Sequence, residues 1–372
     1  MDEGKKRAVA GLWAVPGIGP MAVEKVDRLL GLASITDTLI GEWLDLVTDL
    51  PAQAVRCIPR GRTLGELGDE LLERAAQHHM KIAWHGEPEY PALLAETATA
   101  PPLLFYWGPG TDAPARRRLA MVGTRNPDSL CIATLKPLIA GVAAQGIGIV
   151  SGAARGIDAM AHRGAAAQNG ETWAFLGSAL DQMDPRQASL WHEVKRKGAT
   201  FWTELPPGVR SAPQNYPRRN RLITGASNAL AVLRADMASG TRHSVWYARQ
   251  QGRPMLAVPG PPDAVMAELC NALIKFGYAK MFTEVGDAMR MVGMTGYASH
   301  TPAPVTAKAV ELTSLSADAQ ATYAAIDRVG VCFDDLLPKL EMRSTQLLTA
   351  LFELVTSGHV IEHTGRRYER VA

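Results

Sequence analysis

Apolar residues along the chain follow two different periods, and the change between them divides the sequence. Between about residues 115 and 293, short and almost continuous apolar runs alternate with stretches of helical periodicity. Such runs are typical of parallel strands buried on both faces, with helices covering the sheet. We therefore predict an α/β fold with a doubly wound, mostly parallel Rossmann-like sheet. The runs are Arg118–Gly123, Ile147–Gly152, Thr172–Gly177, Thr200–Leu205, Ala229–Leu233 and Pro254–Pro259.

The segment before this sheet reads as a bundle of short helices. Residues 1 to about 80 have helical spacing of apolar positions, and Val15–Pro20 joins two such stretches with the sequence Val-Pro-Gly-Ile-Gly-Pro. This turn is typical of a helix-hairpin-helix, which presents backbone N–H groups to phosphates without reading sequence. Since a single copy is weak evidence of DNA contact, we favour a structural hairpin inside a sterile-alpha-motif-like domain.

The segment after the sheet begins with linker composition. Residues 296–315 contain Thr301–Thr306, a run of threonine, proline, alanine and valine. Two short helical patterns follow, then a longer one at Ser344–Thr356 and a hairpin with Gly365–Arg367 at its tip. Helices followed by a hairpin predict a winged helix. We expect a helical domain at 1–80, a Rossmann-like domain at 81–295, a linker at 296–315 and a winged helix at 316–372.

Composition limits the compartment and the chemistry. Of the 372 residues, 47% are apolar and 20% are charged, which is ordinary for a globular protein with a real core. No run of about 18 apolar residues occurs, and none follows Met1–Arg7, so we expect neither a membrane span nor a signal peptide. The four cysteines lie far apart, without zinc or dithiol spacing. We expect a cytoplasmic protein with reduced thiols, no metal and no cofactor.

Positive charge is concentrated in the predicted sheet domain. The whole chain has a formal net charge of +2, but Arg116–Gly260 holds 19 Lys and Arg against 8 Asp and Glu, a balance of +11. The rest of the chain therefore sums to −9. A basic domain in a near-neutral chain indicates a polyanion site on that domain, and a solvated basic face is the alternative.

A first turn at a predicted strand end suits an anion. In an open parallel sheet, ligands bind beyond the carboxyl ends of the strands. The turn Val122–Pro127 contains Gly123, Thr124 and Arg125, and it enters a helix that we expect to begin near residue 128 or 129. The glycine allows close backbone approach, the helix N-terminus offers free N–H groups, and Arg125 adds a bidentate phosphate contact.

A second turn has a similar composition at the next strand end. Ser151–Asp158 includes the candidate residues Ser151, Gly152, Arg155 and Gly156. Asp158 can cap the helix that follows. Because glycines and an N-cap occur in any turn from a strand to a helix, this signal is weaker on its own.

A third segment, Tyr216–Arg221, is the richest in positive charge. It contains Arg218, Arg219, Asn220 and Arg221. We predict a loop at the same sheet edge, with its arginines exposed to phosphates beside those of the first two turns, and a solvated loop is the alternative. Replacing its three arginines by alanine is then expected to weaken binding of the polyanion and to leave thermal stability almost unchanged.

The signatures of several enzyme classes are missing. The first turn lacks G-x-G-x-x-G, the second strand ends without an acidic residue for a ribose, and Walker A is absent, which disfavours nucleotide cofactors. Ser151 and Ser178 do not lie in G-x-S-x-G, and neither His162 nor His192 has a spacing that argues for a general base. We expect no enzymatic activity. A nucleotide-binding or nucleotide-hydrolysing Rossmann-like enzyme is the alternative.

Taken in order, these segments resemble the DprA/Smf family over about residues 85–290. The resemblance implies a protein that binds single-stranded DNA in natural transformation, protects it, helps to load the recombinase RecA, and forms a homodimer through the Rossmann-like domain. Departures from the family pattern at Leu233–Asp236, Ser239–His243 and Leu269–Cys270 concern part of the pocket and the dimer face. The matching segments are Glu89–Leu94, Val122–Arg125, Ser151–Asp158, His162–Ala165, Tyr216–Gly225, Ser239–Thr241, Gly252–Gly260, and Asn271–Ile274 with Gly277.

The winged helix keeps a third function open. Such domains usually bind duplex DNA, and the presumed recognition helix starts near Arg343–Gln346. Ser316–Ala372, however, holds 6 Lys and Arg against 8 Asp and Glu, a balance of −2, which lacks the electrostatic footprint of a strong DNA binder. A protein contact or a regulatory role is at least as well supported, and a duplex-binding regulator is the remaining alternative.

Overall fold

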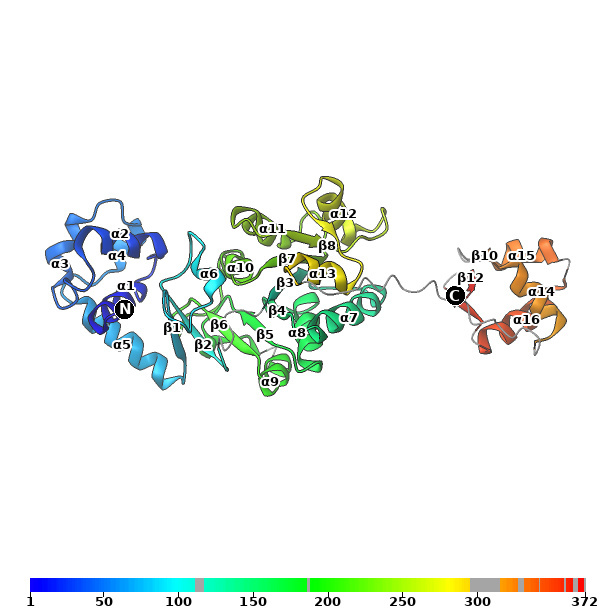
Figure 1. The fold of residues 1–372 in the computed structure, drawn as a ribbon, viewed down its shortest axis with the longest axis horizontal. Helices are drawn as coiled ribbons and strands as arrows, with labels where there is room; N and C mark the ends of the chain where they lie inside the picture. Colours follow the sequence, from blue (N-terminus) through cyan, green and yellow to red (C-terminus); the bar gives the residue numbers. More distant parts are fainter. Residues whose placement is uncertain are drawn as a thin grey trace. The chain divides into compact units, whose positions relative to one another are not determined.

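The computed structural model comprises two compact units, Met1–Tyr297 and Ala298–Ala372, and each is described by itself (Figure 1). The structure describes residues 1–110, 117–185, 188–294, 315–326, 331–340, 342–357, 359–363 and 367–370. The predicted linker lies almost wholly outside these ranges, as do Gly365 and Arg366 at the predicted wing tip.

A nine-stranded sheet forms the centre of the first unit, in the order β1-β2-β6-β5-β4-β3-β7-β8-β9. The strands from β6 to β9 along this order run parallel, and the β1–β2 and β2–β6 pairs are antiparallel. This confirms the doubly wound, mostly parallel sheet. The strands are β1 (Lys81–Trp84), β2 (Leu103–Trp107), β3 (Arg118–Gly123), β4 (Gly148–Ser151), β5 (Thr172–Phe175), β6 (Thr200–Thr203), β7 (Ala229–Arg234), β8 (Met255–Ala257) and β9 (Lys280–Met281).

Helices cover both faces of this sheet because each central strand is apolar on both sides. Along β3, Leu119 and Met121 pack with α7, α8 and α13, while Ala120 and Val122 pack with α6, α10, α11 and α12. In Figure 1, α10, α11 and α12 lie on one side of the sheet and α7 and α8 on the other. The helices are α6 (Ala92–Ala95), α7 (Ser129–Ala144), α8 (Ile157–Ala167), α9 (Ala188–Arg196), α10 (Asn215–Gly225), α11 (Thr241–Gln250), α12 (Glu268–Lys275) and α13 (Val285–Met291).

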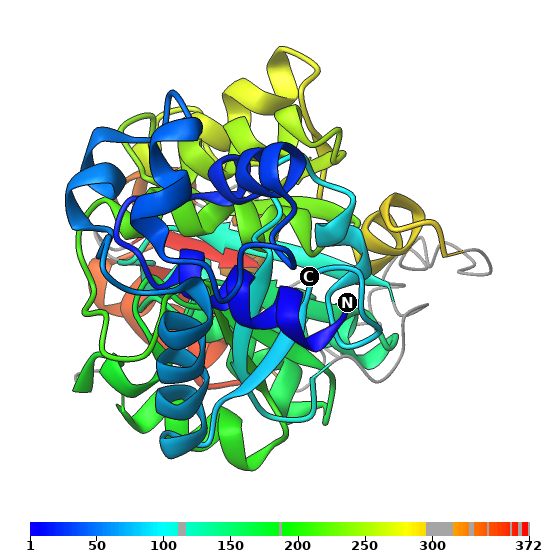
Figure 2. The same cartoon turned by 90° about the vertical axis from the view of Figure 1, so that its left-hand side faces the viewer.

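Short helices form the N-terminal part of the same unit. Their apolar side chains share one core with residues of the sheet, such as Leu103 and Phe105. The 90° view shows these helices in blue on the side of the sheet nearest the viewer (Figure 2). The helices are α1 (Glu3–Trp13), α2 (Pro20–Leu30), α3 (Ile40–Trp43), α4 (Ala52–Cys57) and α5 (Leu64–Gln77).

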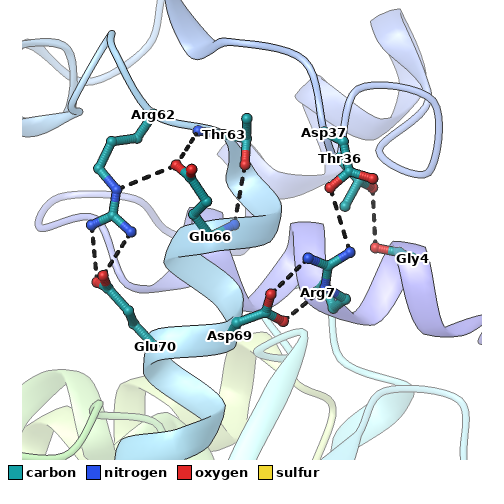
Figure 3. A network of polar contacts seen from close by, with 9 residues as sticks. All are labelled: Gly4, Arg7, Thr36, Asp37, Arg62, Thr63, Glu66, Asp69 and Glu70. Atoms are coloured by element: carbon teal, nitrogen blue, oxygen red, sulfur yellow. Dashed lines mark hydrogen bonds and ion pairs between the residues drawn. The ribbon is translucent and has the colours of Figure 1, made fainter.

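The crossing of α1 and α5 is close and is framed by ion pairs. A Cβ on Gly11 would overlap the carbonyl oxygen of Leu64, so only glycine allows this approach. At the surface, Arg7 donates to both carboxylate oxygens of Asp69, and Arg62 pairs with Glu70 (Figure 3). These pairs are exposed, so the close backbone packing fixes the bundle more than the charges do.

The second unit has the connectivity of a winged helix. Its elements follow in the order α14 (Ala317–Ala325), β10 (Val331–Cys332), α15 (Phe333–Leu340), α16 (Ser344–Thr356), β11 (Val360–His363) and β12 (Arg367–Arg370). The strands form one sheet in the order β10-β12-β11. The longest predicted helix and the hairpin of this segment are thereby confirmed.

No helix within the described ranges combines the length and the apolar character needed to cross a bilayer.

Candidate nucleic-acid interface

The turns that follow the central strands meet where the strand order reverses. β3 pairs with β4 on one side and with β7 on the other, so the chain winds outward in both directions from this point. In doubly wound sheets, the crevice at such a switch point is the usual ligand site. Two adjoining cavities lie along this edge of the sheet.

The larger cavity, which we call the first compartment, has a volume of about 710 Å³. The turns after β4 and β5 supply most of its wall. Its lining residues are Arg125, Gly152, Ala153, Ala154, Arg155, Leu176, Gly177, Ser178, Asp184, Trp191, Ser211, Tyr216 and Arg219.

The second compartment, of about 640 Å³, lies between the turns that follow β3 and β7. Arg125, Ala154, Tyr216 and Arg219 line both compartments, so these four residues form the divide between them. Its lining residues are Val122, Gly123, Thr124, Arg125, Asn126, Ala154, Asp158, Pro213, Tyr216, Pro217, Arg219, Asn220, Ile223, Ser239, Gly240, Thr241, His243 and Ser244.

The first turn carries an exposed arginine at the divide. Thr124 donates its N–H to the carbonyl oxygen of Arg234 at 2.7 Å, which ties the turn to the end of β7. Arg125 lies over the ring of Tyr216, 5.7 Å from the ring centroid. The guanidinium of Arg125 forms no hydrogen bond or ion pair with the residues that the structure describes. Arg125 is thus available to an anion.

The N-terminus of α7 is less available than the sequence suggested. The helix begins at Ser129, as predicted, and the structure shows Asp128 as its N-cap. The Asp128 carboxylate accepts the N–H of Cys131 at 2.7 Å, and the N–H of Asn126 is bound by the Thr124 hydroxyl at 3.2 Å. A carboxylate that already occupies the helix N-terminus opposes an added anion, so the arginine side chains are the better phosphate ligands.

Buried side chains hold the second turn from beneath. Asp158 lies inside α8, and its carboxylate accepts the N–H groups of Gly152 at 3.2 Å and Ala154 at 3.4 Å. The N-cap of α8 is Gly156, so the prediction that Asp158 caps this helix is wrong. Burial raises the pKa of Asp158 above the usual range of a carboxyl.

Ala153 completes this turn with a left-handed backbone, at a φ of 52°. Its N–H donates to Nε2 of His162 at 3.2 Å, and Nδ1 of that ring lies 2.7 Å from the hydroxyl of Thr172. His162 is fully buried, and desolvation lowers its pKa to about 3. The neutral ring therefore accepts the Ala153 N–H and fixes the strained residue in place.

Arg219 is a buried cation with unused donors. It is 5% exposed, and its Nη1 donates to the carbonyl oxygens of Gly152 and Phe175. Its Nε has no hydrogen-bond partner within the described chain. Burial lowers its pKa to about 10, and Asp158 partly offsets this effect. A Cβ on Gly152 would lie 2.6 Å from Nη1, so this glycine makes room for the guanidinium.

The third segment is not a loop, which corrects the sequence prediction. Tyr216–Arg221 belongs to α10, and Arg221 is 8% exposed and paired with Glu204. Ser151 is also fully buried, and its hydroxyl donates to the carbonyl oxygen of Met121 at 2.6 Å. Arg221 and Ser151 therefore support the framework, and the expected cluster of exposed arginines is reduced to Arg125, Arg155 and Arg218.

Only some of the predicted site residues line the two compartments. Ser151, Gly156, Arg218 and Arg221 line neither cavity. Gly156 has a φ of 85°, and a Cβ there would overlap the carbonyl oxygen of Thr124, so it allows the first two turns to touch. The predicted residues that line a compartment are Gly123, Thr124, Arg125, Gly152, Arg155, Arg219 and Asn220.

Sequence reasoning missed some of the lining residues. Tyr216 was part of a quoted segment but not of the predicted site, although an aromatic residue beside arginines is a signal of base stacking. Ser239–Thr241 was noted as a match to a family pattern and Ser239–His243 as a departure from it, but neither was predicted to line the site. Leu176–Ser178 carries no signal in the sequence, since only the strand order brings it to the first compartment.

Metal chemistry has no candidate ligand set here. In the part of the chain that the structure describes, no group of three or more His, Cys, Asp or Glu residues is placed to hold a metal ion.

Comparison with known proteins identifies the family of this chain. Residues 81–293 match the family described as DNA recombination-mediator protein A. The DNA processing protein DprA of Mycobacterium tuberculosis is 34% identical over 271 residues, which are 72% of this chain and 68% of that protein.

Two solved structures share the fold. The X-ray structure of DNA processing protein A from Streptococcus pneumoniae has a TM-score of 0.60 and 26% identity, over 77% of this chain and 95% of that one. A structure on the single-stranded DNA binding mode of DNA processing protein A from Helicobacter pylori has a TM-score of 0.51 and 22% identity, over 57% and 95%. The chain belongs to the DNA recombination-mediator protein A family, whose members process DNA in recombination.

Proposed function

We propose that this protein binds single-stranded DNA across the two compartments, without catalysing a reaction on it. The observation that carries this proposal is Arg125, an exposed guanidinium held over the ring of Tyr216, with no acidic partner among the residues that the structure describes. A cation beside an aromatic face is the combination that binds the phosphates and bases of an unpaired strand. The Helicobacter pylori relative, whose structure was studied for single-stranded DNA binding, supports the same assignment.

The phosphate and the base of a nucleotide are assigned to different side chains of the site. Arg125 and Arg155 are exposed, and Nη2 of Arg155 donates to the side-chain oxygen of Asn126 at 2.6 Å, which positions it beside the first turn. We assign phosphates to these two arginines and to the Arg219 edge. Tyr216 is half-buried and lines both cavities, so its ring is assigned to a base.

The shape of the site favours a single strand over a duplex. The stacking ring and the lining of both compartments are recessed between turns, and a base must leave its stack to reach them. A duplex can reach the two exposed arginines but not the cavities. We therefore expect a strong preference for single strands with little sequence selectivity.

Equilibrium binding tests this function most simply. Full-length protein is titrated with a labelled single strand, with the matching duplex and with free nucleoside mono- and triphosphates, each across a salt series. Tight binding of the single strand alone, with a steep salt dependence, is expected. Equal affinity for the duplex would favour a duplex-binding regulator that acts through the winged helix. Tight binding and turnover of a free nucleotide would favour a nucleotide-hydrolysing Rossmann-like enzyme.

Delivery of the bound strand to RecA is part of the proposal and rests on family membership. The test is RecA assembly on single strands coated with a single-strand-binding protein. Full-length protein is expected to accelerate the assembly, and the Arg125→Ala variant is expected to accelerate it less. No acceleration by the wild-type protein would remove this part of the proposal and leave DNA binding intact.

A homodimer is supported by an exposed apolar surface, which we call the edge patch: Trp246, Phe276, Tyr278 and Met281. These side chains are 56%, 66%, 48% and 51% exposed. Arg249 of α11 lies over the Tyr278 ring at 4.5 Å from its centroid, which places this helix beside the segment leading to β9. β9 is the last strand of the sheet, so an unpaired strand edge adjoins the patch.

A further inference from the structure

We propose that the second compartment is a nucleotide subsite. It holds the base next to the one stacked on Tyr216, so that two successive bases of the strand bind on either side of the divide. The inference deepens the proposed function and depends on it. It adds a second binding position and the residues that contact the base there: Asn220 and Ser244, with His243 at the mouth.

The place of this cavity in the fold favours a ligand. It lies between Gly123, at the end of β3, and the segment Ser239–Ser244 after β7, which includes the first residues of α11, where the strand order reverses. Its volume of about 640 Å³ is large enough for one nucleotide. Arg125, Tyr216 and Arg219 also line the first compartment, so one strand can enter both cavities.

Polar side chains in the wall of this cavity have no hydrogen-bond partner among the described residues. Ser244 is 1% exposed, and its hydroxyl makes no hydrogen bond with the residues that the structure describes. The side-chain amide of Asn220 and the ring of His243 have none within the same ranges. A buried polar group without a partner costs free energy that a bound ligand recovers. An amide and a hydroxyl in a recessed wall suit the hydrogen-bonding edge of a base.

The charges separate the base from its phosphate. The Asp158 carboxylate lines this compartment and opposes a phosphate inside it, whereas Arg125 and Arg219 stand at the divide. Apolar contact comes from Val122, Pro217 and Ile223. We therefore place the base inside the second compartment and the linking phosphate against the arginines of the divide.

Small ligands test this arrangement without the sliding that long strands allow. Full-length protein is titrated with thymidine 3′,5′-bisphosphate and with the dinucleotide pTpTp, by competition against a labelled single strand. The dinucleotide is expected to bind about 5- to 100-fold more tightly. Dinucleotides with an abasic sugar at either position are the controls, and at least one of them is expected to lose this gain.

The Asn220→Ala, Ser244→Ala double variant assigns the gain to the second compartment. Its affinity for the dinucleotide is expected to fall about 3- to 10-fold for each hydrogen bond lost, while its affinity for the bisphosphate stays at the wild-type value. Ser227→Ala is the matched control, because this buried serine of the same region donates to the carbonyl oxygen of Ile223 and lines neither cavity.

Two results would overturn the subsite, and both differ from a failure of the proposed function. One is a dinucleotide that binds wild-type protein no better than the bisphosphate. The other is a double variant that weakens both ligands equally, which would make the second compartment a mononucleotide site. If Arg125→Ala binds every ligand as the wild type does, the proposed function itself fails.

Discussion

At the scale of single residues, Arg125 is the side chain on which DNA binding most depends. It is exposed and forms no ion pair within the described chain, so its removal costs the fold little. Arg125→Ala is expected to lower the affinity for a single strand about tenfold and to flatten the salt slope by about 0.7. Anisotropy titrations across a salt series, with a melting curve of each variant, measure both.

The matched control for this variant is Arg28→Ala. Arg28 is an exposed arginine of α2 whose Nη2 donates to Glu24 at 2.5 Å, and it lines neither compartment. It is expected to retain the wild-type slope. Equal slopes for the Arg125 variant and the wild type would remove Arg125 from the interface.

The buried His162 ring predicts a pH dependence of stability. Desolvation lowers its pKa from 6.5 to about 3, so between these values the unfolded chain binds a proton that the folded chain does not. This contribution to stability is complete above about pH 6.5 and is lost as the pH falls, by up to about 1.4 kcal/mol per pH unit. Urea unfolding at pH 6.5, 5.5 and 4.5 measures it.

His162→Gln separates this residue from the other titrating groups. Glutamine keeps an acceptor for the Ala153 N–H and does not titrate in this range, so the variant is expected to lose stability less steeply on acidification. Parallel stability curves for the variant and the wild type would show that His162 is protonated in the folded protein at these pH values.

At the scale of elements, α10 revises what the arginines of the third segment do. Arg221 forms a buried pair with Glu204, whereas Arg218 is exposed on the same helix. Arg221→Ala is expected to lower the free energy of unfolding by about 3 to 5 kcal/mol, and Arg218→Ala to leave it nearly unchanged. Chemical denaturation of the two variants checks this directly, and an equally stable Arg221 variant would contradict the buried pair.

The strands could be predicted from the sequence to a much larger extent than this helix. The six apolar runs all contain strands, because parallel strands buried on both faces leave a continuous signal. α10 was missed because arginines fill part of its buried face, and hydrophobic periodicity cannot register a buried arginine. The strands β1 and β2 were not predicted either, since they precede the alternating apolar runs and helical stretches and join the sheet antiparallel.

The candidate site could also be predicted only where the sequence carries a local signal. Gly123, Arg125 and Gly152 could be placed at one edge because the order of strands and turns fixes that edge. The divide at Tyr216 and the second compartment depend on α10 and α11, whose side chains reach the edge only in three dimensions. The local sequence does not indicate that side chains of α10 and α11 lie close together at this edge.

At the scale of the whole molecule, the edge patch predicts self-association. Phe276→Ser together with Tyr278→Ser removes two exposed aromatic side chains and is expected to convert a dimer into a monomer at micromolar concentration. Light scattering coupled to size exclusion measures the mass. Leu46→Ser is the control, because Leu46 is 67% exposed outside the edge patch and its replacement should leave the dimer intact. A wild-type protein that is monomeric at this concentration would contradict the proposed homodimer.

The location of the strand on the first unit is the central claim, and photocrosslinking tests it most directly. Full-length protein is irradiated with single strands that carry 5-iodouracil, and the crosslinked peptides are identified by mass spectrometry. Tyr216 is expected to be the main crosslinked residue, because its ring lines both compartments, and Tyr216→Leu is expected to abolish that product. Crosslinks confined to α16 of the winged helix or to the Val15–Pro20 turn, with none at Tyr216, would contradict the account.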